Sequence, residues 1–300
     1  MDSGEFPELR VRLMTWEDVP QVAEIWKDTG LAEGTHSIHT WFRFDPDGFF
    51  VIASDTEVLG VCAAVILHSR LAFVGLYAVK KSHRGKGLGL SIWKRAMEHV
   101  GQRNVGLNSV PEHLHTYRDL AGFRIVAPWC TLFCEGVPQF ADKKRQLEGI
   151  QIVQIRSSVL PAVINYDASV HGYDRSKIVT LSTAEEDSLT LAAVRDGTGR
   201  VCGYGCLKKN VQGSLLVGPL YADEASIAEE LLGNLVAEFP GESNGIISMA
   251  VINCNSEAMS LVNRIQLSIG TEVPRCYKKE QVHANFERVF GQHALNFSPF

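Results

Sequence analysis

The chain has 300 residues, of which 45% are hydrophobic and 21% charged, and its formal net charge is −5 at pH 7. This composition excludes a disordered protein, and the length favours two domains rather than one core. The acidic balance gives no general attraction for nucleic acid or anionic membranes. The longest clean apolar run, Val61–Leu67, is far too short to cross a bilayer. Neither a nucleic acid nor a membrane is therefore expected as a partner.

In chain order, the first half alternates short strands with amphipathic helices. Thr15 is expected to cap the first helix, with Asp18 completing a capping box. A strand at Leu71–Val79 leads into a basic, glycine-rich loop, and a helix with Leu90, Trp93, Met97 and Val100 as its apolar stripe follows. The other expected elements are strands at 10–14, 49–54, 59–68 and 105–109, helices ending near 28 and spanning 37–44, a segment at 111–120 and a closing pair around 122–133.

The loop Arg84–Gly89 is the most informative segment. Its glycines at positions 85, 87 and 89 allow the main chain to approach an anion closely, and the N-terminus of the following helix offers free backbone N–H groups. Arg84 and Lys86 add positive charge, so the loop suits a diphosphate. It lacks the Gly-Lys-Ser/Thr ending of a nucleoside-triphosphate loop and the G-x-G-x-x-G spacing of a dinucleotide loop. A glycine-rich turn without a ligand is the alternative.

The pattern that fits is R-x-x-G-x-G, formed by Arg84, Gly87 and Gly89 between a strand and a helix. It resembles the pyrophosphate loop of the GCN5-related N-acetyltransferase (GNAT) superfamily, which uses acetyl-coenzyme A (acetyl-CoA). The order of elements and the closing Tyr117…Gly122-Phe123 resemble the same family over about Arg10–Glu135. The resemblance implies an α+β fold, with a mixed, mostly antiparallel twisted sheet flanked by helices.

The resemblance also implies a cofactor site and a proton donor. The strand before the loop would hold the pantetheine arm and the thioester carbonyl through its backbone, and Tyr117 would protonate the departing thiolate. A core aromatic residue with a satisfied hydroxyl is the alternative for Tyr117, and a turn cap is the alternative for Asn108. No metal is implied. The implied cofactor-binding residues are Leu76, Ala78, Val79, Arg84, Gly85, Lys86, Gly87, Leu88, Gly89 and Asn108.

The general base is left open by the sequence. The strand Leu71–Val79 carries no carboxylate, so the base would come from another segment or be a water relay. His113 flanks the segment expected to face the cleft and is taken as a catalytic residue beside Tyr117, although each candidate is more often a surface side chain. The candidates are His36, His39, Asp45, Asp47, Glu112, His113 and His115.

An internal repeat relates the two halves of the chain. Gly60 and Gly203 are 143 positions apart, and so are Gly75 and Gly218. The sequence Leu-Tyr-Ala also recurs, one position later than this offset, which suggests that Pro219 is an inserted residue. Matches at a nearly fixed offset predict the duplication of a whole domain, with the boundary in the polar stretch 136–149.

The second half departs from the family at the loop. Asp223–Ser226 stands in its place, and its two carboxylates would cap the next helix while repelling a diphosphate. We therefore expect a GNAT domain at 1–135, a linker at 136–149 and a divergent GNAT-like domain without a pyrophosphate loop at 150–280. This pairing resembles a tandem subgroup of the family, on the sequences at 110–112, 171–175, 217–223 and 253–258. The tail 281–300 is expected to be helical and to dock back, and Asp167, Asp174 and Arg175 are candidates for reaching the substrate.

Together these features predict a cytoplasmic, acetyl-CoA-dependent N-acetyltransferase. The primary amine of a small molecule is expected to attack the thioester directly in a ternary complex. A protein lysine or N-terminus as the acceptor stays open, and so does a homodimer. The seven cysteines lie mostly in apolar segments without a C-x-x-C pair, which indicates buried thiols in a reducing compartment. The alternatives are a non-catalytic acyl-CoA sensor or scaffold and a different nucleotide-binding fold.

Overall fold

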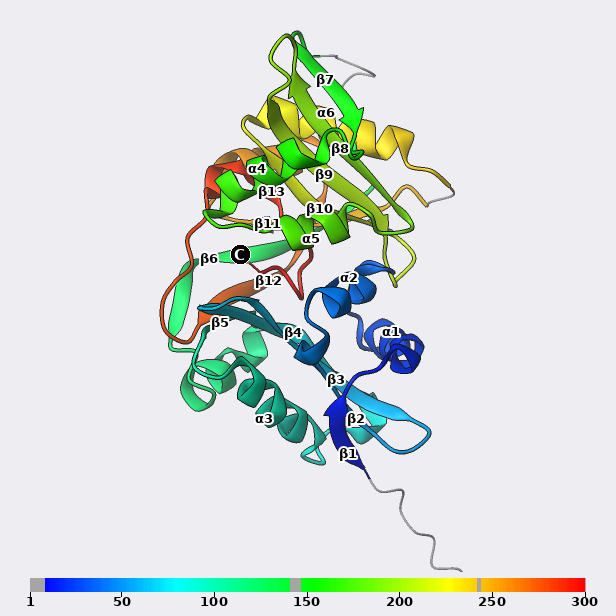
Figure 1. Cartoon of the computed structure of the whole chain (residues 1–300), viewed down its shortest axis with the longest axis vertical. Coiled ribbons are helices and arrows are strands. Elements are labelled where there is room, and N and C mark those ends of the chain that lie inside the picture. Colours follow the sequence, from blue (N-terminus) through cyan, green and yellow to red (C-terminus); the bar gives the residue numbers. More distant parts are fainter. Residues whose placement is uncertain (1–8, 141–146, 242–243, 300) are drawn as a thin grey trace, which may run out of the picture.

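The strands of the computed structural model form one continuous mixed sheet that runs through both halves of the chain (Figure 1). The structure describes residues 9–140, 147–241 and 244–299. The strands are β1 Arg10–Leu13, β2 Phe49–Ala53, β3 Val58–His68, β4 Leu71–Val79, β5 Asn104–Asn108, β6 Ile125–Gly136, β7 Ile150–Gln154, β8 Ser188–Arg195, β9 Val201–Lys209, β10 Leu215–Ala222, β11 Ile247–Ile252, β12 Ser268–Tyr277 and β13 Val289–Gly291. Most neighbouring pairs are antiparallel, whereas β4–β5 and β10–β11 are parallel. This confirms the expected α+β fold.

Helices cover both faces of the sheet in each half. In the first half, α1 (Val19–Thr29) and α2 (Ser37–Phe44) pack on one face and α3 (Leu88–Val100) on the other, because successive strand residues point to opposite faces. In the second half, α4 (Leu160–His171) and α5 (Ser176–Ser182) lie opposite α6 (Ala225–Glu238) and α7 (Ser256–Arg264).

Two local expectations about helices have different outcomes. The capping box of Thr15 and Asp18 is confirmed, in a 3-10 turn just before α1. The apolar stripe predicted for α3 is partly wrong. The buried residues of this helix are Ile92, Ala96 and Val100, whereas Leu90 is exposed. A spacing of four residues aligns these three side chains toward the sheet, whereas Leu90 lies about half a turn away from Ile92.

The two halves are related by an approximate two-fold arrangement in which each exchanges a strand with the other. The sheet order is β1-β2-β3-β4-β5-β12-β6-β11-β10-β9-β8-β7, so each of the strands β1 to β6 has its counterpart six strands further along the chain. β12 lies between β5 and β6, and β6 lies between β12 and β11. The predicted linker at 136–149 connects β6 to β7, and its positions 141–146 lie outside the described residues.

The register corrects one detail of the predicted repeat. β4 has one residue more than its partner β3 between Gly75 and Ala78, and β10 has the same bulge against β9. An uninterrupted offset of 143 therefore relates the two strands. Pro219 is the counterpart of Leu76 and not an inserted residue.

The carboxy-terminal tail docks on the protein but is not the predicted helix. It forms a 3-10 turn at Phe286–Arg288 and the strand β13, and then continues without regular structure along the middle of the molecule (Figure 1). Backbone pairing with β10 replaces a helix here. Beyond β13, the tail crosses β4 and β10 at the repeat glycines: a Cβ at Gly75 would collide with the carbonyl of Asn296, and one at Gly218 with that of His293.

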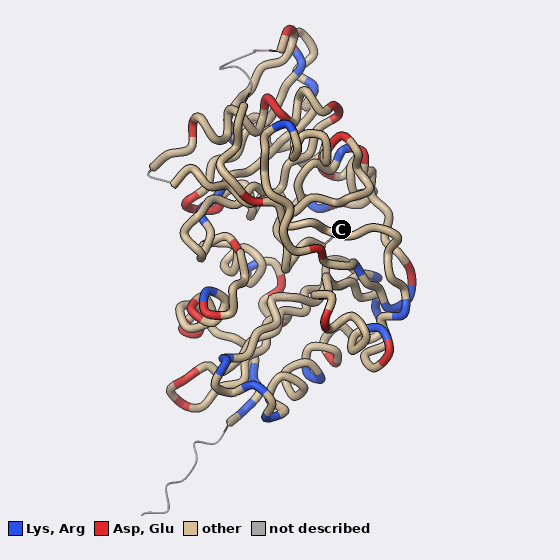
Figure 2. Tube along the Cα trace, turned by 180° about the vertical axis from the view of Figure 1, so that it is seen from behind, with Lys and Arg blue, Asp and Glu red and all other residues tan. Residues whose placement is uncertain are grey.

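Other properties of the surface and core agree with the composition. Lys and Arg are interspersed with Asp and Glu in both halves (Figure 2). Cys62, Cys134, Cys202, Cys206 and Cys276 are buried. Within the described ranges, every helix is too short or too polar to cross a membrane.

Candidate active site

A pocket of about 540 Å³ opens where β4 and β5 separate. Leu71–Phe73 of β4 pair in parallel with Asn104–Gly106 of β5. Beyond these residues, the backbone N–H and C=O groups on the facing edges of the two strands are no longer paired with each other. The glycine-rich loop lies at the same end of β4. Lys86 does not line this pocket. The predicted residues that do line it are Leu76, Ala78, Val79, Arg84, Gly85, Gly87, Leu88, Gly89, Asn108, His113 and Tyr117.

The bulge in β4 turns the strand's backbone toward the pocket. Leu76 has φ +51°, a left-handed conformation that is rare for a branched side chain. Its side chain is buried in the core against α1 and α2, which keeps the residue in this conformation. Strained backbone of this kind is concentrated at ligand-binding sites, and a bulge is a common way to re-aim groups out of a ladder.

The loop is held against the end of β4 and opens directly into α3. Arg84 Nε donates a hydrogen bond to the carbonyl of Val79 at 3.0 Å. Gly85 and Gly87 have φ +76° and +78°, with open space where a Cβ would be. Gly89 lies close to the Tyr77 hydroxyl, which a Cβ at this position would displace. The first N–H groups of α3 thus face an open, basic cradle, which is a favourable site for an anion.

Tyr117 presents a free hydroxyl to the pocket. It lies in a π-helical turn, Thr116–Leu120, with its ring 5.4 Å from Trp93 and 6.4 Å from Phe123 between centroids. Within the described chain the hydroxyl has no hydrogen-bond partner, and burial raises the pKa of Tyr117. A neutral phenol can donate a proton, so Tyr117 stays a candidate for the acid.

Asn108 is engaged on both sides of its amide group. Its Nδ2 donates to the carbonyl of Leu295 at 2.6 Å, and its Oδ1 accepts from Arg275 Nε at 2.6 Å. Its side chain therefore joins β5 to β12 and to the tail. This arrangement leaves little hydrogen-bonding capacity for pantetheine, and it is not a turn cap either.

Most of the candidate bases lie away from the pocket. His113 lines it from an exposed position at its edge. Asp45 accepts from the backbone of Ile66 at 2.7 Å and lies 3.2 Å from His99. His36 lies near Glu186 and Asp187, and His39 stacks on Trp16. The remaining candidates, Asp47, Glu112 and His115, are exposed.

The candidates from the second half are also separate from this pocket. Asp167 and Arg175 form a buried pair at 3.3 Å, and Asp167 accepts a hydrogen bond from Tyr204 at 2.6 Å. Asp174 and Arg175 line another cavity, of about 410 Å³, between α2 and α5.

Several lining residues could not be predicted from local sequence. Val273 comes from β12, and Leu295 and Asn296 come from the tail, so all three reach the pocket only through the strand exchange and the docking of the tail. One signal for the close approach of the tail is the repeated glycine at positions 75 and 218. The other lining residues that sequence reasoning missed include Thr29, Leu31, Tyr77, Trp93, Leu107 and Val110.

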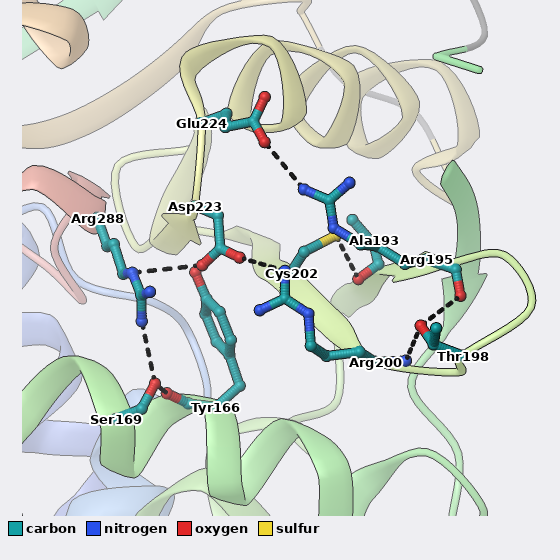
Figure 3. Close-up of polar contacts among 10 residues, drawn as sticks. All are labelled: Tyr166, Ser169, Ala193, Arg195, Thr198, Arg200, Cys202, Asp223, Glu224 and Arg288. Atoms are coloured by element: carbon teal, nitrogen blue, oxygen red, sulfur yellow. Dashed lines mark hydrogen bonds and ion pairs between the residues drawn. The ribbon is translucent and has the colours of Figure 1, made fainter. Parts of the chain in front are cut away.

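The corresponding place in the second half is filled by ion pairs (Figure 3). α6 begins at Ala225, directly after Asp223-Glu224, where the first half has its loop. Asp223 lies 3.1 Å from Arg200 and 3.3 Å from Arg288, and Glu224 lies 2.9 Å from Arg195. Glu224 pairs with this arginine instead of capping α6, so the predicted carboxylate cap is wrong.

One of these pairs has a counterpart in the first half with its charges exchanged. Lys80 and Glu57 form an ion pair at 2.7 Å, and the repeat offset of 143 relates them to Asp223 and Arg200. The first half thus has a cation at the end of β4, where the loop begins, and the second half has a carboxylate there.

Comparison with known proteins identifies both halves. A model described as acetyltransferase (GNAT) family matches residues 11–121, and one described as acetyltransferase (GNAT) domain matches residues 163–291. The holothin acyltransferase of Pseudoalteromonas sp. (strain SANK 73390) is 26% identical over 234 residues, covering 75% of this chain and 76% of that protein.

Solved structures share the whole fold. A candidate acetyltransferase from Pyrococcus horikoshii has a TM-score of 0.73 at 18% identity, covering 97% of this chain and 96% of that one. A tandem GNAT protein from the clavulanic acid biosynthesis pathway has a TM-score of 0.59 at 15% identity, covering 90% and 95%. With GNAT domains at 11–121 and 163–291, the chain is a tandem member of the GCN5-related N-acetyltransferase family.

Proposed function

We propose that this GNAT acyltransferase moves an acetyl group from acetyl-CoA to a primary amine of a small molecule. The family uses acyl-CoA as cosubstrate. The observation that carries the proposal is the pocket itself, which joins the bulged end of β4, the cradle at the N-terminus of α3 and the free Tyr117 hydroxyl. In the second half, Asp223-Glu224 stands before α6 where the first half has its glycine-rich loop.

The residues of the pocket fit the parts of the cofactor. The N–H groups that follow Gly87 and the basic loop would hold the pyrophosphate, and the released edge of β4 would bond the pantetheine amides. The thioester would then lie near the bulge at Leu76, opposite Tyr117. The amine nitrogen attacks the carbonyl carbon, the C–N bond forms and the C–S bond breaks. The thiolate takes the Tyr117 proton as it leaves, and the nitrogen loses a proton to a base.

A small acceptor is favoured by the tail. Leu295 and Asn296 wall the pocket on the side of α1, together with Thr29 and Leu31, and Asn296 lies against β4 at Gly75. An extended peptide would have to displace this segment. The holothin acyltransferase, whose name indicates a small-molecule acceptor, supports the same class of substrate.

The test measures thermal stability with and without acetyl-CoA and then thiol release over a panel of primary amines that includes holothin. At one hundred times its Kd the cofactor should stabilise the protein by about 2.7 kcal/mol. Acyl-CoA esters of longer chains, in the same plate, identify the acyl group. Stabilisation without thiol release from any amine would favour the sensor, and no stabilisation would contradict the cofactor site.

Replacing Tyr117→Phe is expected to lower kcat by about 100-fold, because a positioned general acid contributes roughly that much or more. Stabilisation by acetyl-CoA should be unchanged, since the ring still packs on Trp93 and Phe123. The measurement is steady-state thiol release, with Tyr173→Phe, which lines the other cavity, as the matched control. Equal kcat values for Tyr117→Phe and the parent would exclude the hydroxyl as the acid.

A further inference from the structure

A buried carboxyl group lies behind the pocket wall to which Leu31 and Asn296 belong. Glu33 follows α1 and is 1% exposed. Asn296 faces this carboxyl group with both its side chain and its backbone, and Asn296 also lines the pocket. The carbonyl of Asn296 lies against Gly75, next to the bulge at Leu76. One residue therefore separates Glu33 from the strand that would hold the thioester.

Glu33 is an incompletely paired acid in a small buried cluster. Lys208 Nζ lies 2.7 Å from Glu185 Oε2, and both side chains are 3% exposed, so one cation serves two carboxyl groups. Among the described residues, Glu33 Oε1 has no hydrogen-bond partner. Burial raises the pKa of Glu33 to about 8, with Glu185 adding to the shift and Lys208 and Asn296 opposing it. His293, near Lys208, has its pKa lowered by burial and stays neutral.

Asp167 also has an oxygen without a hydrogen-bond partner among the described residues and a pKa raised by burial, but of these two acids it is Glu33 that lies next to a residue lining the pocket, Asn296. A buried carboxyl group that only supported the fold would be expected to have both oxygens satisfied, because an unpaired polar atom in the interior costs about 1–3 kcal/mol. Such unsatisfied, shifted acids are typical of functional sites. No motif in the sequence marks Glu33, because its neighbours come from β9, the turn before β8 and the tail.

We propose that Glu33 is the base that takes the proton from the acceptor ammonium, through one water, at the wall formed by Leu31 and Asn296. The inference rests on the proposed transferase function. The ammonium gives one proton to the Glu33 carboxylate, and the neutral nitrogen attacks the thioester carbonyl. As the C–S bond breaks, Tyr117 protonates the sulfur, and the second proton from nitrogen restores the Tyr117 hydroxyl. Glu33 then returns its proton to water.

The expected signature is a pH profile. Because Glu33 acts as the carboxylate, kcat/KM for an alkylamine should rise with pH and level off above about 8. Glu33→Gln keeps the size and neutrality of the protonated acid, so it should fold and be stabilised by acetyl-CoA like the parent. In this variant, kcat/KM should no longer rise with pH, and kcat at pH 8 should be at least 100-fold lower than in the parent. Glu186→Gln is the matched control, since that carboxylate is exposed and lies in the same region.

The measurements use the full chain, acetyl-CoA and the amine that gives the fastest thiol release in the panel, with His113→Gln as the rival variant. The proposal is supported if the rise of kcat/KM with pH is lost in Glu33→Gln and retained in His113→Gln. The reverse, or parental kcat in Glu33→Gln, overturns it while leaving the transferase intact. No thiol release by the parent with any amine overturns the transferase and the role of Glu33 together.

A second readout needs no acceptor. The raised pKa of Glu33 means that the native state holds a proton which the unfolded chain releases from about pH 4.5 upward, so ionisation of Glu33 destabilises the fold as pH rises toward 8. The thermal midpoint of Glu33→Gln should therefore increase relative to that of the parent as the pH rises from 5 to 9. Parallel midpoints over this range would show that Glu33 is ionised throughout and would contradict a base that is protonated at neutral pH.

Discussion

Replacing Gly87→Glu is expected to abolish the stabilisation by acetyl-CoA and to reduce thiol release to the background rate. Gly87 has φ +78° and immediately precedes α3, and the space around its Cβ position is open toward the pocket that it lines. A glutamate there would place a carboxylate where the diphosphate is expected, among the N–H groups that would bind it. Thermal shift and thiol release, each with a titration of acetyl-CoA, measure the two effects.

The matched control is Gly197→Glu in the second half. Gly197 has φ +71° and equally open surroundings, so both substitutions add the same side chain and a similar backbone strain of about 1–2 kcal/mol. Gly197 lies in the turn between β8 and β9, away from the pocket. Gly197→Glu should keep the full acetyl-CoA shift. A parental shift in Gly87→Glu would mean that the cofactor does not use this loop.

The features that the sequence could predict are those that short segments encode. The strand, loop and helix around Arg84–Gly89 follow from local pattern, and the glycine offset of 143 revealed the duplication before any contact was known. The bulge at Leu76 left no such mark, because a leucine with positive φ is an effect of the core around it rather than of its own preference. Its counterpart Pro219 was for that reason misread as an insertion.

The parts that could not be predicted depend on contacts between distant segments. β12 completes the sheet of the first half, and the tail walls its pocket, yet both belong to the carboxy-terminal sequence. The tail was expected to be helical because Phe286, Val289 and Phe290 have helical spacing. Strand pairing with β10 and three hydrogen bonds from the Asn255 amide to backbone carbonyls override that local preference.

The strand exchange also changes the role of the second half. Its β12 contributes Val273 to the pocket, its β9 contributes Lys208 to the cluster at Glu33, and its tail contributes Asn296 to both. The divergent half has ion pairs where a second pyrophosphate loop would be. Its structural contribution is therefore to the first site, which neither half forms alone.

Replacing Arg275→Leu is expected to cost about 3–5 kcal/mol of unfolding free energy, which is typical when one partner of a buried charged network is removed. Arg275, on β12, is fully buried. Its guanidinium donates to Asn108 Oδ1 at 2.6 Å and to the carbonyl of Ser298 at 2.8 Å. It also lies over the rings of Phe73 and Trp129, at 4.8 and 5.4 Å from their centroids. One side chain thus links β4, β5, β6 and the tail.

The cost arises from the partners that remain. Leucine leaves the Asn108 oxygen and the Ser298 carbonyl without their donor in the interior, and it cannot replace the stacking of the guanidinium on two aromatic rings. Because Asn108 also holds Leu295 in the pocket wall, the variant should bind acetyl-CoA more weakly. Arg275→Lys should recover part of the loss, since it keeps the charge but not the planar fork.

Urea unfolding measures the effect, and Arg264→Leu is the control. Arg264 forms an ion pair with Glu229 at 2.8 Å, but its side chain is 46% exposed, so that pair should contribute less than about 1 kcal/mol. A large loss confined to Arg275→Leu would place the main link between the halves at the exchanged strand. If the unfolding free energies of both variants lie within 1 kcal/mol of the parent value, the backbone pairing of β12 with β5 and β6 must hold the exchanged strand. Arg275 would then contribute little to the stability of that interface.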